Sequence, residues 1–291
     1  MSRLDLSGID PRRKRTDRLA RAALAGVAFL SVALLVALVG TLVVKGAPHV
    51  TKTFLTSYPS RFPSRAGALP AIVGTLLLGA VSMAAALPIG IAAAIYLQEF
   101  ARANRVTTLL RASIGNLAGV PSVVFGILGL ALFVRALMLG KSILAAGLTL
   151  GLLTLPIIIV VCEEALKTVP RSMREAAFAL GASRWQVVRH HVLPYALPGM
   201  LTGSILALSR SMGETAPLIL IGAAVYIGYM PGGLMDSFTA LPIQAYYWAQ
   251  DARTAFHDLA WAAVLVLLVL VALGNLTAIL LRDRYQRRYK W

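Results

Sequence analysis

Cysteine and charge are both scarce in this chain of 291 residues. The one cysteine, Cys162, excludes an intrachain disulfide and any metal site built from several thiolates. Charged residues make up 14% of the chain, against roughly 25% in soluble domains, while 58% of the residues are hydrophobic. The composition therefore predicts a membrane protein rather than one or two soluble domains.

Hydrophobic runs recur along the sequence, and a helical span of a bilayer needs roughly 20 apolar residues. We expect an all-α polytopic protein with six transmembrane helices, at residues 22–44, 69–97, 113–139, 144–166, 195–221 and 256–281. The first follows a basic tail, residues 1–21, but it is longer than the core of a signal peptide and lacks a cleavage site, so we expect it to be retained. A second basic tail covers residues 282–291. Proline inside a span kinks or breaks it, and such residues are Pro88, Pro121 and Pro156.

The distribution of lysine and arginine predicts the orientation of these spans. With a cytoplasmic N-terminus, 20 of the 28 basic residues lie on the cytoplasmic side and seven on the opposite side. The positive-inside rule therefore places both termini in the cytoplasm. This asymmetry and the attraction to anionic lipid headgroups explain the net charge of +16, so no nucleic-acid partner is needed.

Motifs for nucleotide and metal binding are incomplete. GKS at residues 140–142 matches the end of a phosphate-binding loop, but that motif requires glycine at a position where the chain has Arg135. His190 and His191 are adjacent, do not share a helix face and have no third ligand nearby. We therefore expect no catalytic residue, metal or nucleotide site in this chain, which would not be an enzyme.

Residues 167–194, between the fourth and fifth spans, predict two short helices. Capping-box spacing, with Glu or Gln three residues after serine, begins at Ser172 and at Ser183, and each box marks a helix start. Gly181 stands where the first helix must turn, because a left-handed residue there is least costly as glycine. Pro194 is expected to end the second helix.

The predicted hairpin has apolar and charged faces. On its first helix the apolar stripe is Met173, Ala176, Ala177 and Leu180, and the charged side is Arg171, Arg174 and Glu175. On its second helix Trp185, Val188 and Val192 oppose Arg184 and Arg189. An apolar stripe ringed by charge in a cytoplasmic loop favours docking of a soluble partner, with packing on the chain's own bundle as the alternative. A DNA-reading helix-turn-helix is disfavoured because no third helix is available to support it.

The run EAAFALGASRWQVVRHHVLP resembles the EAA loop of bacterial ABC importer permeases. That pattern is E-A-A, three residues, G, nine residues and I-x-L-P, and His191 stands where isoleucine is usual. The matching residues are Glu175, Ala176, Ala177, Gly181, Leu193 and Pro194. Three further runs, AAIYLQEFA, NLAGVPSVVFGILGLALFV and GETAPLIL, are similar to the phosphate-specific branch, and the last favours its A-type permease subunit.

The resemblance implies a type-1 ABC importer permease core over residues 69–281, with cytoplasmic coupling helices at 171–194; residues 1–60 are covered least. In that family the loop fits a groove on a cytoplasmic ATPase, which implies that four residues serve ATPase coupling: Glu175, Ala176, Ala177 and Gly181. The implied partners are a second homologous permease subunit, two ATP-binding cassette subunits and an extracytoplasmic phosphate-binding protein. ATP and Mg would be bound by the cassette subunits, and this chain would need no cofactor.

Arg210 and Glu214 stand in the middle of the fifth predicted span. An ionised side chain at mid-bilayer costs roughly 2.5 to 3.5 kcal/mol, so a pair there must be compensated or useful. A spacing of four residues places both side chains on one helix face, where they can pair. Pro217 cannot donate to the carbonyl of Gly213, which predicts a helix break beside the pair. Loosened backbone at that depth is covered by protein or lines water, so these residues predict a substrate pathway.

Arginine suits phosphate because its planar fork donates two parallel hydrogen bonds and keeps its charge at physiological pH. We expect Arg210 to take the anion transiently while Glu214 holds the guanidinium in place. The alternative is an ion pair that only locks the fifth span to a neighbour.

Together these features predict the permease subunit of an ATP-driven importer of inorganic phosphate in a bacterial plasma (inner) membrane, working by alternating access. An ABC importer for another oxyanion is one alternative. A proton-coupled secondary transporter that uses Glu214 as proton carrier is another.

Overall fold

The computed structural model describes residues 11–224 and 226–288. This part of the chain is helical apart from its connecting loops and an isolated antiparallel bridge between Ser142 and Ser237. Of the two predicted basic tails, residues 1–10 and 289–291 lie outside the described residues.

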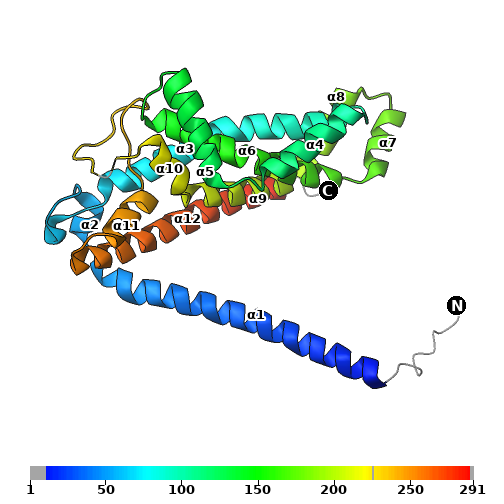
Figure 1. Ribbon diagram of the computed structural model, residues 1–291. Helices are drawn as coiled ribbons and strands as arrows, with labels where there is room; N and C mark the ends of the chain where they lie inside the picture. Colours follow the sequence, from blue (N-terminus) through cyan, green and yellow to red (C-terminus); the bar gives the residue numbers. More distant parts are fainter. Residues whose placement is uncertain (1–10, 225, 289–291) are drawn as a thin grey trace.

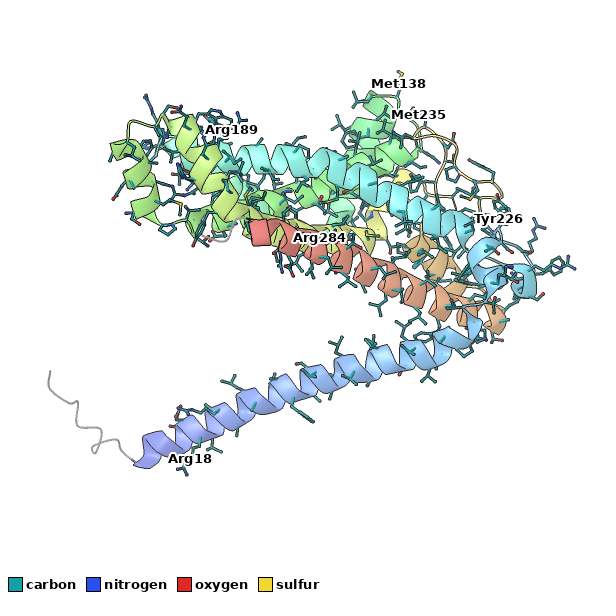
Figure 2. All side chains as sticks on the ribbon, turned by 180° about the vertical axis from the view of Figure 1, so that it is seen from behind. Arg18, Met138, Arg189, Tyr226, Met235 and Arg284 are labelled. Carbon is teal, nitrogen blue, oxygen red and sulfur yellow. The ribbon has the colours of Figure 1, made fainter. Side chains whose placement is uncertain are left out.

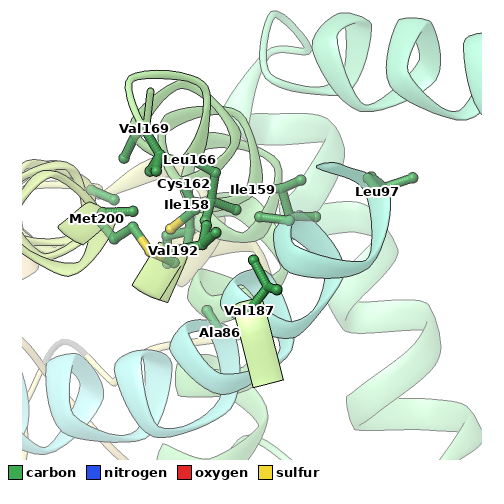
Figure 3. Packing of buried hydrophobic residues seen from close by; sticks show 14 of the residues in the cluster. Ala86, Leu97, Ile158, Ile159, Cys162, Leu166, Val169, Val187, Val192 and Met200 are labelled. Carbon is green, nitrogen blue, oxygen red and sulfur yellow. The ribbon is translucent and has the colours of Figure 1, made fainter. Parts of the chain in front are cut away.

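Four long helices form the bundle: α3 (Leu69–Ile95), α6 (Ile143–Lys167), α9 (Leu193–Met212) and α12 (Thr254–Arg288) (Figure 1). Helix α6 lies in its interior, between α3 and α9, and has many buried side chains. Figure 3 shows Ile158 and Cys162 of α6 packed near Ala86 of α3 and Met200 of α9. Helix α6 is thus covered on most sides by its neighbours, whereas the most hydrophobic stretch of α12 is uncovered within this chain.

Helix α1 (Pro11–Gly46) stands apart from the bundle in both views (Figures 1 and 2). It contacts α12 near its own C-terminal end, where the Lys45 amino group lies 5.2 Å from the centre of the Trp261 ring. Its apolar side chains are otherwise almost all exposed. A helix that is hydrophobic on all sides needs lipid or another protein around it. Three short turns lead from it to α3: η2 (Ala47–His49), α2 (Lys52–Thr56) and η3 (Pro63–Arg65).

The third predicted span is broken next to Pro121, which confirms the kink or break expected there, and its first helix begins at Arg105, earlier than predicted. Helix α4 (Arg105–Leu117) is followed by α5 (Ser122–Gly129) and the π-helical segment η5 (Leu130–Ala136), with a bend of 102° between the two halves. Proline disfavours helical backbone in the residue before it, and Pro121 is the residue that precedes α5. Pro88 and Pro156, in contrast, lie inside the uninterrupted helices α3 and α6.

The fifth predicted span is also divided, because α9 ends at Met212 and α10 (Ala216–Ile221) begins after a short break. A loop then leads to α11 (Leu241–Ala249), which packs against α12. Five helices among the described residues are long and apolar enough to cross a membrane, or six when α4 and α5 count as one bent span. The number of six spans therefore agrees with the sequence, whereas two of them are not straight helices.

Between α6 and α9 lie α7 (Arg171–Ala179), α8 (Arg184–Val187) and the π-helical segment η6 (Val188–Val192). The end of α3 continues as a further π-helical segment, η4 (Tyr96–Phe100). In Figure 1, α4, α7 and α8 gather at one end of the bundle, opposite the end that holds α2 and α11.

Candidate functional site

Helices α7 and α8 form the predicted hairpin. Gly181, between them, has φ of +81°, which confirms the left-handed turn. The capping box at Ser183 is also confirmed: its hydroxyl oxygen accepts from the N–H of Gln186 at 3.4 Å, and its own N–H donates to the Gln186 Oε1 at 2.7 Å. The local sequence thus determines the turn and the start of α8.

Two other boundaries of the hairpin differ from the prediction. Helix α7 begins at Arg171, directly after Pro170, and no side chain caps it, so the box expected at Ser172 was wrong. Proline sets a helical φ and needs no hydrogen-bond partner for its nitrogen, which allows the helix to start there without a serine cap. Pro194 does not end the second helix, because η6 leads directly into α9 and the helix runs on from Arg184 to Met212. Proline cannot donate to a carbonyl of the preceding turn, and the wider π-helical turn of η6 lies at this position.

The predicted apolar stripe of α7 is divided between two environments. Met173 and Ala177 pack against the bundle, whereas Ala176 is exposed and Leu180 is 89% exposed. The hairpin therefore packs on its own chain with one side and leaves another side uncovered within this chain. That uncovered apolar side consists of Phe178, Leu180 and Trp185, and we call it the hairpin apolar surface.

The four residues expected to serve ATPase coupling are distributed accordingly. Glu175, Ala176 and Gly181 are exposed, and Ala177 is buried in the core cluster. Glu175, Ala176 and Gly181 therefore lie on the exposed part of the hairpin, together with the hairpin apolar surface.

Arg174 of the hairpin does not point in the direction that the sequence predicted. It was expected on the charged outer side, but its guanidinium points inward, donating to the Glu99 Oε1 at 2.8 Å, to the Val169 carbonyl at 2.7 Å and to the Leu166 carbonyl at 3.0 Å. Glu99 is only 9% exposed. The signal for this contact was present in the sequence, because an acidic residue in the apolar run AAIYLQEFA needs a cation.

Arg210 and Glu214 meet at the end of α9. Arg210 lies in the last turn, and Glu214 lies beyond the helix, where its N–H donates to the Ser211 carbonyl at 3.2 Å. The Arg210 Nε and the Glu214 Oε1 are 3.8 Å apart. The two side chains therefore do pair, but across a helix end, so the expectation that they share the face of one helix was wrong.

This helix end lies in the middle of the bundle. A side chain added at Gly79, ten residues into α3, would meet the side chain of Met212. The Ser209 hydroxyl donates to the Asn275 Oδ1, well inside α12. The charged pair thus lies beside the middle of α3 and α12.

Pro217 begins a new helix rather than weakening a long one. It stands in the first turn of α10, where a missing N–H leaves no bond unmade, and Gly213 caps the end of α9. Helix α10 packs on α5: a Cβ added to Gly126 would lie 2.8 Å from the Pro217 Cα. Glycine at 126 is required for this approach, which places the two broken spans in direct contact.

A cavity of about 550 Å³ lies beside the break, between α11 and α12. Gly213 and Thr215 line it from the break, and Tyr246, His257 and Trp261 line it from the other two helices. Its lining is largely apolar and does not include Arg210 or Glu214. Among the described residues, no group of three or more His, Cys, Asp or Glu side chains could hold a metal ion.

Comparison with known proteins relates these features to a family. Residues 86–291 match the family described as binding-protein-dependent transport system inner membrane component. PstA 1, a phosphate transport system permease protein of Mycobacterium tuberculosis, is 35% identical over 228 residues, covering 76% of this chain and 72% of that protein. PstA of Haemophilus influenzae, also a phosphate transport system permease protein, is 32% identical over 249 residues, covering 84% and 86%.

A solved structure of a bacterial alginate ABC transporter, in complex with a periplasmic protein carrying alginate pentasaccharide, has the same fold. The TM-score is 0.64 at 16% identity, over 92% of this chain and 94% of that one. The predicted ABC importer permease fold is thereby confirmed. Because the family match covers most of the sequence, the chain belongs to the binding-protein-dependent transport system inner membrane components.

Proposed function

We propose that this chain is the permease subunit of an ATP-driven importer of inorganic phosphate and forms one half of its translocation pathway. The relatives named above, which are phosphate transport system permease proteins, support the substrate. The environment of Arg210 supports the pathway.

One observation carries this proposal: the Arg210 side chain is 58% exposed in the middle of the bundle. A charged side chain at mid-bilayer faces protein or water, not lipid. The exposed side of Arg210 must therefore be covered in the assembled protein, and a second homologous permease subunit with a water-filled path between the two subunits would cover it.

The geometry of the pair also suits transient binding of an anion. At 3.8 Å the contact between the Arg210 Nε and the Glu214 Oε1 is too long for a hydrogen bond, so the guanidinium donors stay available for phosphate. Glu214, 19% exposed, stabilises the position of the cation and lowers the net attraction for the anion. A site that binds weakly can release its ion and pass it on.

The hairpin is the part of the chain that would contact the ATPase subunits. Its apolar surface, together with Glu175, Ala176 and Gly181, would dock on two ATP-binding cassette subunits, which bind ATP and Mg. The positive-inside rule places the hairpin and both termini in the cytoplasm of a bacterium, and an extracytoplasmic phosphate-binding protein would meet the opposite side. Movement of the docked hairpin would drive alternating access; this chain needs no cofactor for that role.

Reconstitution of the affinity-purified complex tests the proposal. Its attached subunits are identified first, and uptake of labelled phosphate into vesicles is then measured with and without ATP. We expect uptake that requires ATP and that excess sulfate or molybdate leaves unchanged. Displacement by one of those ions would support the importer of another oxyanion, and uptake driven by a proton gradient without ATP would support a secondary transporter.

A further inference from the structure

The π-helical segment η4, at the end of α3, contacts four other elements: α4, α6, α7 and α8. Chain connections join the hairpin to α6 and to α9, but the hairpin has no short covalent connection to α3 or α4. Its contact with η4 is made by side chains. π-Helical turns within helices are frequently found at functional sites.

The first of these contacts is the ion pair between Arg174 on α7 and Glu99 on η4, at 2.8 Å. Arg174 also holds two backbone carbonyls at the end of α6 and just after it. Both side chains are largely withdrawn from water, so the loss of either one leaves the other without its counter-charge. A rigid, hydrogen-bonded pair of this kind transmits displacement from α7 to η4.

The second contact joins η4 to the broken third span. Arg111 on α4 donates to the Leu97 carbonyl at 2.5 Å and lies 3.5 Å from the Glu163 Oε1 on α6. Glu163 is 8% exposed, and this carboxylate oxygen has no hydrogen-bond partner. Arg111 therefore contacts both η4 and α6, and it holds α4 against the two elements.

Aromatic contacts complete the junction on the α8 side. The Phe100 ring centre lies 6.4 Å from the Trp185 ring centre and 5.7 Å from the Arg184 Cζ. Both helices of the hairpin thus rest on η4, one through an ion pair and the other through ring contacts.

We propose that the Glu99–Arg174 pair and the hydrogen bond from Arg111 to the Leu97 carbonyl connect the hairpin to α4 through η4, so that Arg174 and Arg111 are positioning residues that convey hairpin movement to the broken third span. The inference rests on the proposed function for the source of that movement. Helix α4 continues into α5, which packs on α10 next to the Arg210 break. The Glu99–Arg174 pair and the Arg111 hydrogen bond to Leu97 therefore complete a contiguous path of packed elements from the hairpin to Arg210.

A double-mutant cycle tests this role in the reconstituted complex. The variants are Arg174→Gln, Glu99→Gln and the double variant, and the readout is phosphate taken up per ATP hydrolysed. We expect each single variant to lower this ratio at least tenfold. The double variant removes the unpaired buried charge, so it should assemble as well as the native chain and still show the low ratio. Arg105→Gln, which removes an exposed cation from the same helix as Arg111, should leave the ratio within twofold of native.

A native ratio in the double variant would overturn the inference, because the pair would then serve stability alone. Native ratios in both single variants would overturn it too. If a single variant fails to assemble, the double variant decides.

A distance measurement separates this inference from the proposed function. Labels on Ser172→Cys and Leu109→Cys, both exposed, report the separation of α7 and α4 when nucleotide binds. We expect the distance between α7 and α4 to stay constant when the Glu99–Arg174 pair is native, and to change on nucleotide binding in the Glu99→Gln, Arg174→Gln double variant. An identical response in both would overturn the connection. Absence of phosphate uptake by the native complex would refute only the proposed function.

Discussion

Replacement of Arg210 by glutamine removes the cation at the break of the fifth span while keeping a polar side chain of similar length. The side chain is 58% exposed within this chain and stands 3.8 Å from the Glu214 Oε1, and in the proposed water-filled path the pair would be solvated like an exposed ion pair. Such pairs contribute about 0 to 1 kcal/mol, and we expect the variant to fold and assemble normally.

The expected loss of transport is much larger. Hydrogen bonds to a charged group contribute about 1.5 to 3 kcal/mol, and glutamine loses both the charge and the paired donors of the guanidinium. At about 1.4 kcal/mol for each factor of ten, phosphate uptake should fall roughly 10- to 100-fold.

The assay is ATP-dependent uptake of labelled phosphate in vesicles that hold the complete complex, normalised to the amount of assembled protein. Arg135→Gln is the matched control, because Arg135 is also an exposed arginine, on η5 rather than at the break. Native uptake by the assembled Arg210→Gln complex would refute the reasoning and leave the pair as a structural contact between helices.

Two further predictions concern the hairpin and the loop before α12. Valine at Gly181 would meet no neighbouring atom but would have to adopt φ of +81°, at a cost of about 1 to 2 kcal/mol, so less ATPase should copurify with Gly181→Val. Gly115→Val, in open space on a helix, is its control, and equal recovery with both variants would contradict the docking role. Side-chain hydrogen bonds from Arg253 lower the pKa of Asp251 from 3.8 to about 2. Because the folded-state pKa is the lower one, the pair stabilises the fold above about pH 4 and is lost only as the pH falls towards 2. The thermal midpoint of Asp251→Asn should therefore lie below that of the native chain throughout pH 5.5 to 8, and a midpoint equal to or above the native one within this window would refute the assignment.

Several features of the candidate site were predictable because they depend on neighbouring residues. The turn at Gly181 follows from the cost of a left-handed backbone for other residues, and the capping box at Ser183 needs only a glutamine three residues later. Arg210 and Glu214 lie close together although Glu214 is outside the helix, because the chain after Met212 turns without moving the carboxylate out of reach.

Other features were not predictable from local patterns. The inward direction of Arg174 depends on Glu99, which is 75 residues away in the sequence. The apolar period of α7 alone assigned that arginine to the outer side, because a helix pattern records which residues are polar but not where a buried counter-charge lies.

Composition, charge distribution and turn residues by themselves determined that this protein is a multi-span membrane protein with a hairpin between its fourth and fifth spans, since hydrophobic length and turn chemistry act within a few residues; its role as a permease was predicted from a family resemblance. The breaks of the third and fifth spans lie beside Pro121 and Pro217, where the sequence also predicted them. Only the tertiary structure decided that α5 and α10 meet at Gly126 and that the hairpin is joined to η4 by the Glu99–Arg174 ion pair, because those contacts join segments far apart in the chain.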